Sequence, residues 1–363
     1  MNNSFSFGRA FRISVFGSSH GPHVGVEVEG CPKGLEISEG EIQRELDRRK
    51  PGSGPLVSGR KEEDVLIVES GIKNGKATGG RIRMLVKNND ANPAHYAAFG
   101  KTPRPGHADF TSGIKYGKAD SGGGFFSGRM TAAFVMAGAV AKKLLLARGI
   151  STLAFARQIG GVKLEGGVSD KMILENTYGN DVRTADMVVA RKMSAAVEKA
   201  KNAGNSIGGI VECRVTGVPP GIGEPMFCSI ESSISRAIFA IPAAKGIEFG
   251  AGFASAGMLG SEHNDAFYFE GGKVRTRTNN AGGVLGGLSS GMPIVFRVAF
   301  KPTASIFMEQ ETVNLETHSS ARLRIQGRHD PCIAIRAVPV VENVAAFCMA
   351  DILLGNEEGE HEA

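Results

Sequence analysis

Residues 130–148 restrict the fold more than any other segment, because apolar side chains cover almost every face of the helix that they predict. A helix that is apolar all round must be buried, and Gly149 is a typical residue just beyond a helix C-terminus. The rest of the chain therefore has to wrap around this helix. Its apolar part, residues 132–146, contains Lys142 and Lys143 and is too short to cross a bilayer, so we expect no membrane span.

Short strand-like runs lie on both sides of this helix in the sequence. Several of them alternate apolar with polar residues, as half-buried antiparallel strands do. The runs are residues 12–16, 24–28, 65–68, 81–86, 210–215, 266–269 and 293–300.

Further helices are predicted at three places. Ser38 and Glu41 have the spacing of a capping box at a helix start, and an apolar repeat marks residues 230–238. The last helix is expected over residues 342–354. The following residues, 355–363, are acidic and polar, and we expect them to be disordered.

One turn sequence occurs twice. VEGCPKGL at 28–35 resembles VTGVPPGI at 215–222, and each copy follows a predicted strand and precedes a helix start. The repeat indicates two related strand–turn–helix units, although a common turn pattern explains it as well. No Pro/Ser-rich linker separates the halves. We therefore expect one compact α+β unit over residues 1–354, with pseudo-duplicated halves and helices packed with antiparallel sheets.

Charge and cysteine content exclude several classes of protein. The net charge of +5 fits a small anionic substrate, whereas the absence of Trp and of a long basic tract argues against the alternative of an RNA-binding protein. The five cysteines show neither CxxC nor metal-ligand spacing, so we expect free thiols and no metal site. With no signal-peptide core at the N-terminus, these features predict a cytoplasmic protein.

Two histidines lie next to glycines in predicted loops. His20 belongs to GSSHG, directly after the strand at 12–16, and His107 belongs to RPGHAD. Loop histidines titrate near neutral pH and suit general acid–base catalysis. Taken singly, a histidine in such a loop is more often a plain surface residue than a catalytic one. Ser19 beside His20 does not make a nucleophile without a third partner.

Two glycine-rich loops are typical of anion binding. Residues 120–131, DSGGGFFSGRMT, open the apolar helix, where backbone N–H groups and Arg129 suit an anion, although a plain helix cap is the alternative. Residues 282–291, GGVLGGLSSG, precede a strand and KPTAS at 301–305, which together offer a phosphate cradle. A small-molecule kinase has similar loops, but it needs a pair of Mg²⁺-binding carboxylates, and it leaves both histidine motifs unexplained.

The order of these motifs resembles that of one known family. GSSHG, RPGHAD, the GGG loop, GGLSSG, KPT and GRHDP at 327–331 follow one another as they do in chorismate synthases, and ECRVTGVPPGIGEP and PAAKG are also similar. The resemblance covers residues 7–354. It implies an anti-1,4-elimination of phosphate from 5-enolpyruvylshikimate 3-phosphate to give chorismate. Reduced FMN is then required, although the reaction has no net redox change.

The resemblance also implies roles for single residues. His20 matches the histidine that protonates the leaving phosphate, and His107 matches the one that protonates reduced flavin near N1. Asp330 matches the carboxylate that assists deprotonation near flavin N5, and Ser19 and Ser127 match serines proposed to relay protons. The positions that match FMN contacts are Phe125, Phe126, Ser127, Pro242, Ala243, Gly286, Lys301, Pro302, Thr303, Ala304, Ser305 and Arg328.

Three arginines match the substrate pocket of the family, namely Arg49, Arg60 and Arg129. Planar guanidinium groups suit the phosphate and the carboxylates of such a substrate. Phe125 and Pro55 stand where many relatives have arginine, so each departure removes a cation from the anion contacts. Arg49 also matches a position assigned to NADP in bifunctional relatives.

The source of reducing equivalents is open between NADPH, used by the protein itself, and an external flavin reductase. No GxGxxG motif opens a βαβ unit in this chain, which favours a monofunctional enzyme supplied with reduced flavin from outside. The resemblance also implies a homotetramer.

Overall fold

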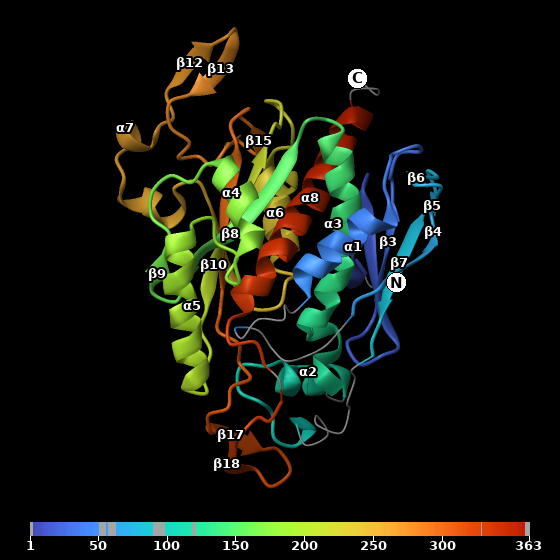
Figure 1. Cartoon of the computed structure of the whole chain (residues 1–363), viewed down its shortest axis with the longest axis vertical. Coiled ribbons are helices and arrows are strands. Elements are labelled where there is room, and N and C mark those ends of the chain that lie inside the picture. Colours follow the sequence, from blue (N-terminus) through green and yellow to red (C-terminus); the bar gives the residue numbers. More distant parts are fainter. Residues whose placement is uncertain are drawn as a thin grey trace.

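A helical layer lies between two five-stranded antiparallel sheets (Figure 1). The computed structural model describes residues 3–50, 56, 63–89, 99–117, 121–327 and 329–359. The predicted α+β architecture, in which helices pack with antiparallel sheets, is confirmed. Outside the described residues lie Pro51, Pro55, Arg60, Asp120, Arg328 and residues 360–363.

The two sheets contain most of the strands predicted from the sequence. The order in the first sheet is β1 (Ser6–Phe7), β2 (Arg12–Gly17), β3 (His23–Glu29), β7 (Ile82–Lys87), β4 (Leu66–Ser70). The order in the second is β11 (Ala244–Phe249), β16 (Ile294–Phe300), β10 (Gly209–Thr216), β8 (Ser151–Ile159), β9 (Val162–Lys163). Four hairpins lie outside them: β5 (Ile72–Lys73) with β6 (Lys76–Ala77), β12 (Phe267–Glu270) with β13 (Lys273–Thr276), β14 (Val284–Leu285) with β15 (Leu288–Ser289), and β17 (Gln310–Asn314) with β18 (Ser319–Leu323).

All four predicted helices are present, as α1, α3, α6 and α8, although the bounds of the last one differ. The α-helices are α1 (Glu39–Arg49), α2 (Asp109–Tyr116), α3 (Thr131–Leu146), α4 (Asp170–Asn176), α5 (Met187–Asn202), α6 (Ile230–Ile238), α7 (Gly260–His263) and α8 (Ile333–Gly359). Helix α3 contacts strands of the first sheet, α8 contacts β8 and β10 of the second, and the two helices contact each other. Helices α2, α4, α5 and α7 were not predicted, nor were strands β8 and β11.

The two halves of the chain repeat one topology. The series β2, β3, α1, β4, β7, α3 recurs as β8, β10, α6, β11, β16, α8, with the same neighbours in each sheet. Gly30 and Gly217, at the same place in the repeated turn, have φ of 81° and 85°, and an added Cβ would meet a backbone carbonyl oxygen at either position. The predicted duplication is thus confirmed by topology as well as by turn sequence.

Helix α3 is buried as its composition predicts. Most of its residues are buried, and Gly149 beyond its end has φ of 74°. The N–H of Ile150 donates to the carbonyl of Leu145 at 3.0 Å, which satisfies a carbonyl that the helix end leaves without an internal partner. The capping box of Ser38 and Glu41 is also present at the start of α1.

The prediction for the last helix is wrong at both ends. Helix α8 begins at Ile333 and includes Pro339, and it continues to Gly359, so residues 355–359 are helical rather than disordered. An ion pair of Arg148 with Glu357, at 2.8 Å, holds this last turn against the end of α3. By length and composition this helix could span a membrane. However, 89% of its apolar 18-residue stretch is buried inside the protein, as expected for a core helix.

The contact between α3 and α8 depends on a glycine. A Cβ added at Gly138 would lie 2.3 Å from Cβ and 2.5 Å from the carbonyl oxygen of Asn343. We expect Gly138→Ala to lower the free energy of unfolding by about 1–3 kcal/mol, because the helices must separate. Urea unfolding measures the change. The control, Gly113→Ala on α2, adds a Cβ with no atom within 4 Å and should be neutral or stabilising; equal destabilisation of both variants would contradict the prediction.

Candidate active site

Two of the arginines expected in the substrate pocket meet at a buried carboxylate. Arg49 is the last residue of α1, and its Nη2 lies 2.5 Å from Asp64 Oδ2. Arg129, in the turn that leads into α3, pairs through Nη1 with Asp64 Oδ1. All three side chains are at most 2% exposed. Asp64 was not predicted as a site residue, because a carboxylate that follows Glu62 and Glu63 has the pattern of a solvated acidic run.

Burial and pairing set the charges of this cluster. Burial lowers the pKa of Arg49 to about 10, while Asp64 acts in the opposite direction. Burial also acts to raise the pKa of Asp64, but Arg49 and Arg129 outweigh it and hold that pKa below its ordinary value. Arg49 and Asp64 are therefore both charged at neutral pH.

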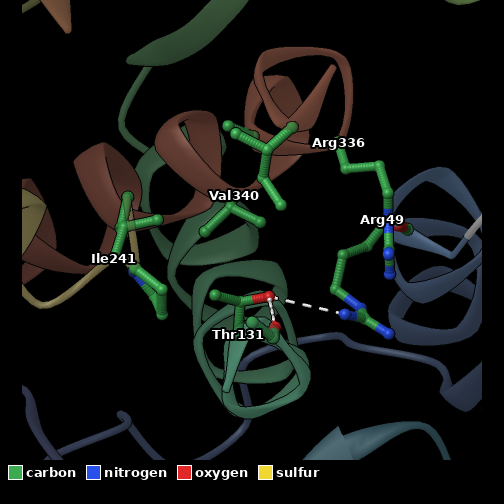
Figure 2. A pocket seen from close by; sticks show the side chains of 9 residues that line it. Arg49, Thr131, Ile241, Arg336 and Val340 are labelled. Atoms are coloured by element: carbon green, nitrogen blue, oxygen red, sulfur yellow. Dashed lines mark hydrogen bonds between the residues drawn. The ribbon is translucent and has the colours of Figure 1, made fainter. Parts of the chain in front are cut away.

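A small pocket of about 40 Å³ opens beside Arg49. Figure 2 shows Arg336 and Thr131 next to the Arg49 side chain, and Arg49 Nη1 donates to Thr131 Oγ1 at 3.4 Å. Arg49 Nε is buried and has no hydrogen-bond partner among the described residues. Arg336 Nη1 donates to Asp330 Oδ2 at 2.7 Å. The pocket is lined by Arg49, Gly128, Thr131, Ile241, Pro242, Ile333, Arg336, Ala337 and Val340.

The His20 loop is linked by hydrogen bonds to Arg129. Ser19 is buried, and its Oγ lies 3.2 Å from His20 Nδ1. Asn88 Nδ2 donates to two carbonyls of this loop, at 2.9 and 2.7 Å, and Asn88 Oδ1 accepts from Arg129 Nε at 2.9 Å. The N–H of Arg129 in turn donates to Ser127 Oγ at 3.3 Å. Hydrogen bonds of Asn88 thus join residues that were predicted from separate motifs, namely His20 and Ser19 in one and Ser127 and Arg129 in the other. Asn88 itself was not predicted.

A second cluster surrounds His107. Its Nε2 lies 2.8 Å from Ser305 Oγ, and Lys301 Nζ donates to the carbonyl of Gly106 at 2.7 Å. Arg104 holds Asp109 with two hydrogen bonds of 2.7 Å each. Burial, followed by the Arg104 guanidinium, lowers the pKa of His107 to about 4, so the imidazole is neutral at pH 7.

Several expected cofactor positions lie together. The N–H of Lys301 donates to the carbonyl of Ala243 at 3.0 Å, and Ala243 has φ of 72°, an unusual value for a residue other than glycine. Its neighbour Pro242 lines the pocket beside Arg49. Thr303 Oγ1 and His329 Nε2 are buried without a hydrogen-bond partner in the described part of the chain. Unpaired buried polar atoms of this kind fit a site that a polar ligand completes.

Other expected positions are not joined to this cluster. Gly286 is exposed in the turn between β14 and β15, and that hairpin contacts residues 219–230. Phe125 and Phe126 are each 46% exposed, and the Phe125 ring packs on Phe5 with a centroid distance of 4.8 Å. Arg60 and Arg328 lie outside the described residues. Within the described residues no group of His, Cys, Asp and Glu side chains could hold a metal ion.

Known proteins that are similar to this chain identify its family. The family model for chorismate synthase matches residues 11–354. The chain belongs to the chorismate synthase family. A chorismate synthase of Korarchaeum cryptofilum is 48% identical over 355 residues, which are 97% of this chain and 98% of that protein. One of Methanosarcina mazei is 49% identical over 349 residues, 96% of this chain and 95% of that protein.

A solved structure supports the fold as well as the family. It is described as a crystal structure of chorismate synthase, and it matches with a TM-score of 0.78 at 29% identity, covering 96% of this chain and 93% of that one. The chorismate synthase fold therefore accounts for both sheets and the helical layer between them.

The lowered pKa of His107 predicts a dependence of stability on pH. In the unfolded chain a histidine titrates near pH 6.5, whereas folded His107 stays neutral down to about pH 4. As pH falls through this window the unfolded chain takes up a proton that the folded protein does not, so the free energy of unfolding falls, by roughly 3 kcal/mol over the full window. His107→Gln should therefore lose less stability than the unmodified protein between pH 7 and 4.

Thermal unfolding followed at several pH values measures this effect. His318→Gln, which replaces an exposed histidine in the β17–β18 turn, is the matched control and should leave the pH profile unchanged. If both variants follow the profile of the unmodified protein, buried His107 does not contribute to the pH dependence of the free energy of unfolding.

Proposed function

We propose that the protein eliminates phosphate from 5-enolpyruvylshikimate 3-phosphate to give chorismate, the last step of the shikimate pathway. One observation carries the proposal beyond family membership: the buried Arg49–Asp64–Arg129 cluster is joined through Asn88 to the His20 loop. A substrate with a phosphate and two carboxylates needs fixed cations, and a phosphate that leaves needs a proton donor beside them.

In this proposal His20 gives a proton to the departing phosphate. Ser19 Oγ, 3.2 Å from His20 Nδ1, fixes the orientation of the ring. Ser127, which accepts from the N–H of Arg129, lies in the same group of residues and is assigned to proton relay. Arg49 and Arg129 bind the anionic groups and hold the substrate in register.

The described residues also fit a flavin. Thr303 Oγ1 and His329 Nε2 are buried and without partners in the part of the chain that the structure describes, beside the Lys301–Ala243 contact. Reduced FMN, when bound, supplies electron density as the phosphate leaves. Asp330, oriented by Arg336 at 2.7 Å, assists removal of the proton from the substrate carbon. His107 is neutral in the ligand-free protein, and an anion bound nearby raises its pKa toward the range of a general acid.

Exposed aromatic residues support the proposed homotetramer. The arm that contains α7, β12 and β13 projects from the rest of the protein (Figure 1), and an apolar patch of this kind marks an interaction surface. Its exposed apolar side chains are Phe253, Leu259, Phe267, Phe269 and Val274. We propose that this enzyme works in the cytoplasm as an assembly of identical chains.

An anaerobic assay with the purified protein, chemically reduced FMN and the enolpyruvyl substrate tests the proposed reaction. Chorismate is followed by its absorbance and by the release of inorganic phosphate in equal amount. Release of phosphate without chorismate would indicate a phosphatase and would overturn the proposal.

Substitution of His20 tests the proton donor. We expect His20→Ala to lower the maximal rate by about 10²–10⁴, because the leaving phosphate loses its acid, while the affinity for FMN changes little. His263→Ala on α7 is the control and should keep the full rate. A His20 variant within threefold of the unmodified enzyme would remove His20 from the mechanism.

The source of electrons is a separate prediction. We propose a monofunctional enzyme that depends on an external flavin reductase, because the chain has no dinucleotide-binding motif and Pro55 replaces an arginine of many relatives. NADPH with oxidised FMN should then give little chorismate, while addition of a flavin reductase should restore turnover. Sustained turnover with NADPH, FMN and this protein alone would mean that Arg49 and its neighbours suffice to bind NADPH.

A further inference from the structure

Asp64 is an unusual residue at the centre of the arginine cluster. Its side chain is fully buried, and each carboxylate oxygen pairs with a different arginine. Its backbone has φ of 51°, in the left-handed region that residues other than glycine rarely adopt. A strained, buried carboxylate that no predicted role explains is a candidate for a function of its own.

The two arginines that share Asp64 are held in different ways. Arg129 uses every guanidinium nitrogen within the protein: Nη1 to Asp64, Nε to Asn88 Oδ1 at 2.9 Å and Nη2 to the carbonyl of Lys87 at 3.0 Å. Arg49 gives Nη2 to Asp64 and makes a long contact of 3.4 Å from Nη1 to Thr131 Oγ1. Its Nε is buried without a partner among the described residues.

Asp64 therefore fixes one edge of the Arg49 guanidinium, while the Nε edge has no hydrogen-bond partner among the described residues. Arg49 and Arg336 line the same pocket. Figure 2 shows this guanidinium at the pocket beside Thr131. Among the ion-paired groups that the structure describes here, Arg49, Arg129 and Arg336 carry three positive charges, and Asp64 and Asp330 carry two negative charges, so one positive charge is in excess. An oxyanion at the pocket would satisfy both the unpaired Nε and the excess charge.

We propose that Asp64 is a positioning residue that holds Arg49 turned so that its Nε edge receives an oxyanion group of the substrate. Without the carboxylate, two buried guanidinium groups repel each other, and Arg49 loses the contact that fixes its orientation. The identity of the substrate rests on the function proposed above, whereas the binding of an oxyanion at this pocket does not.

Chemical rescue tests this role. Asp64→Gly suits the backbone, because glycine adopts φ of 51° without strain, and it leaves a space that formate can enter. We expect KM for the substrate to rise about 10–100-fold, with a smaller change in kcat, because a misplaced guanidinium binds the anion poorly. Added formate should lower KM again and raise the melting temperature of the variant. Calorimetry with inorganic phosphate should show the same loss and recovery of affinity without any turnover.

Glu212 provides the matched control. Its buried carboxylate, on β10 in the second sheet, also pairs with arginines, namely Arg214 at 2.8 Å, Arg297 at 2.9 Å and Arg157 at 3.7 Å. Glu212→Ala should lose stability, but its KM should stay unchanged and should not respond to formate. This comparison separates a specific effect on Arg49 from the general cost of breaking a buried ion pair.

Two results would overturn the proposal: a KM of Asp64→Gly within twofold of that of the unmodified enzyme, or tighter phosphate binding by the variant, which would mean that Asp64 competes with the substrate. If Asp64→Gly does not fold, the isosteric Asp64→Asn is measured in the same way and judged by the same two results. If the unmodified protein makes no chorismate while the phosphate affinities follow the prediction, the proposed function fails and the role of Asp64 stands.

Discussion

The contact between α3 and α8 is the constraint on which the rest of the structure depends. Helix α3 contacts mainly the first sheet and α8 contacts the second, so the two sheets are joined mainly through this helical layer. The contact is close because Gly138 has no side chain opposite Asn343. It also contains charge: Lys142 on α3 lies between Glu45 of α1 and Glu342 of α8, and Asn343 Nδ2 donates to Glu45 at 2.8 Å. Removal of one partner from such a buried ion pair is strongly destabilising, because it leaves a buried charge without compensation. This network fixes the helices in one register as well as bringing them together.

That register determines the geometry of the candidate site. Glu45, held by Lys142 and Asn343, lies one turn before Arg49 on α1, so the core network fixes the end of the helix that presents the arginine. Arg129 lies just before α3, and Asp330 lies just before α8. Site residues that are far apart in the sequence are therefore carried by the ends of three helices that already pack together. Precision at the site follows from rigid elements rather than from the loops alone.

Sequence patterns predicted the elements whose environment is simple and missed those that depend on distant partners. Helix α3 is apolar on every face because it is buried on all sides. In β16, every second residue is buried, which reflects burial of one face of the strand. The end of α8 was wrongly expected to be disordered because its acidic residues look solvated, whereas Glu357 is paired with Arg148 from a distant part of the chain. The same reason explains why Asp64 and Asn88 were overlooked: their roles arise from contacts with Arg129 that no local spacing reveals. The histidine and arginine motifs were found because their order along the chain resembles that of a family.

The duplicated topology has a consequence for how the site is divided between the halves. Helices α3 and α8 occupy equivalent places in the two units, and both begin at the same end of the molecule (Figure 1). The charged side chains that the structure describes just before them nevertheless differ, since Arg129 precedes α3 and Asp330 precedes α8. A pair of identical units would present the same charge from both sides and could not tell the two ends of a ligand apart. Divergence of the two helix starts gives the site a polarity, so that an asymmetric molecule can enter in one orientation only.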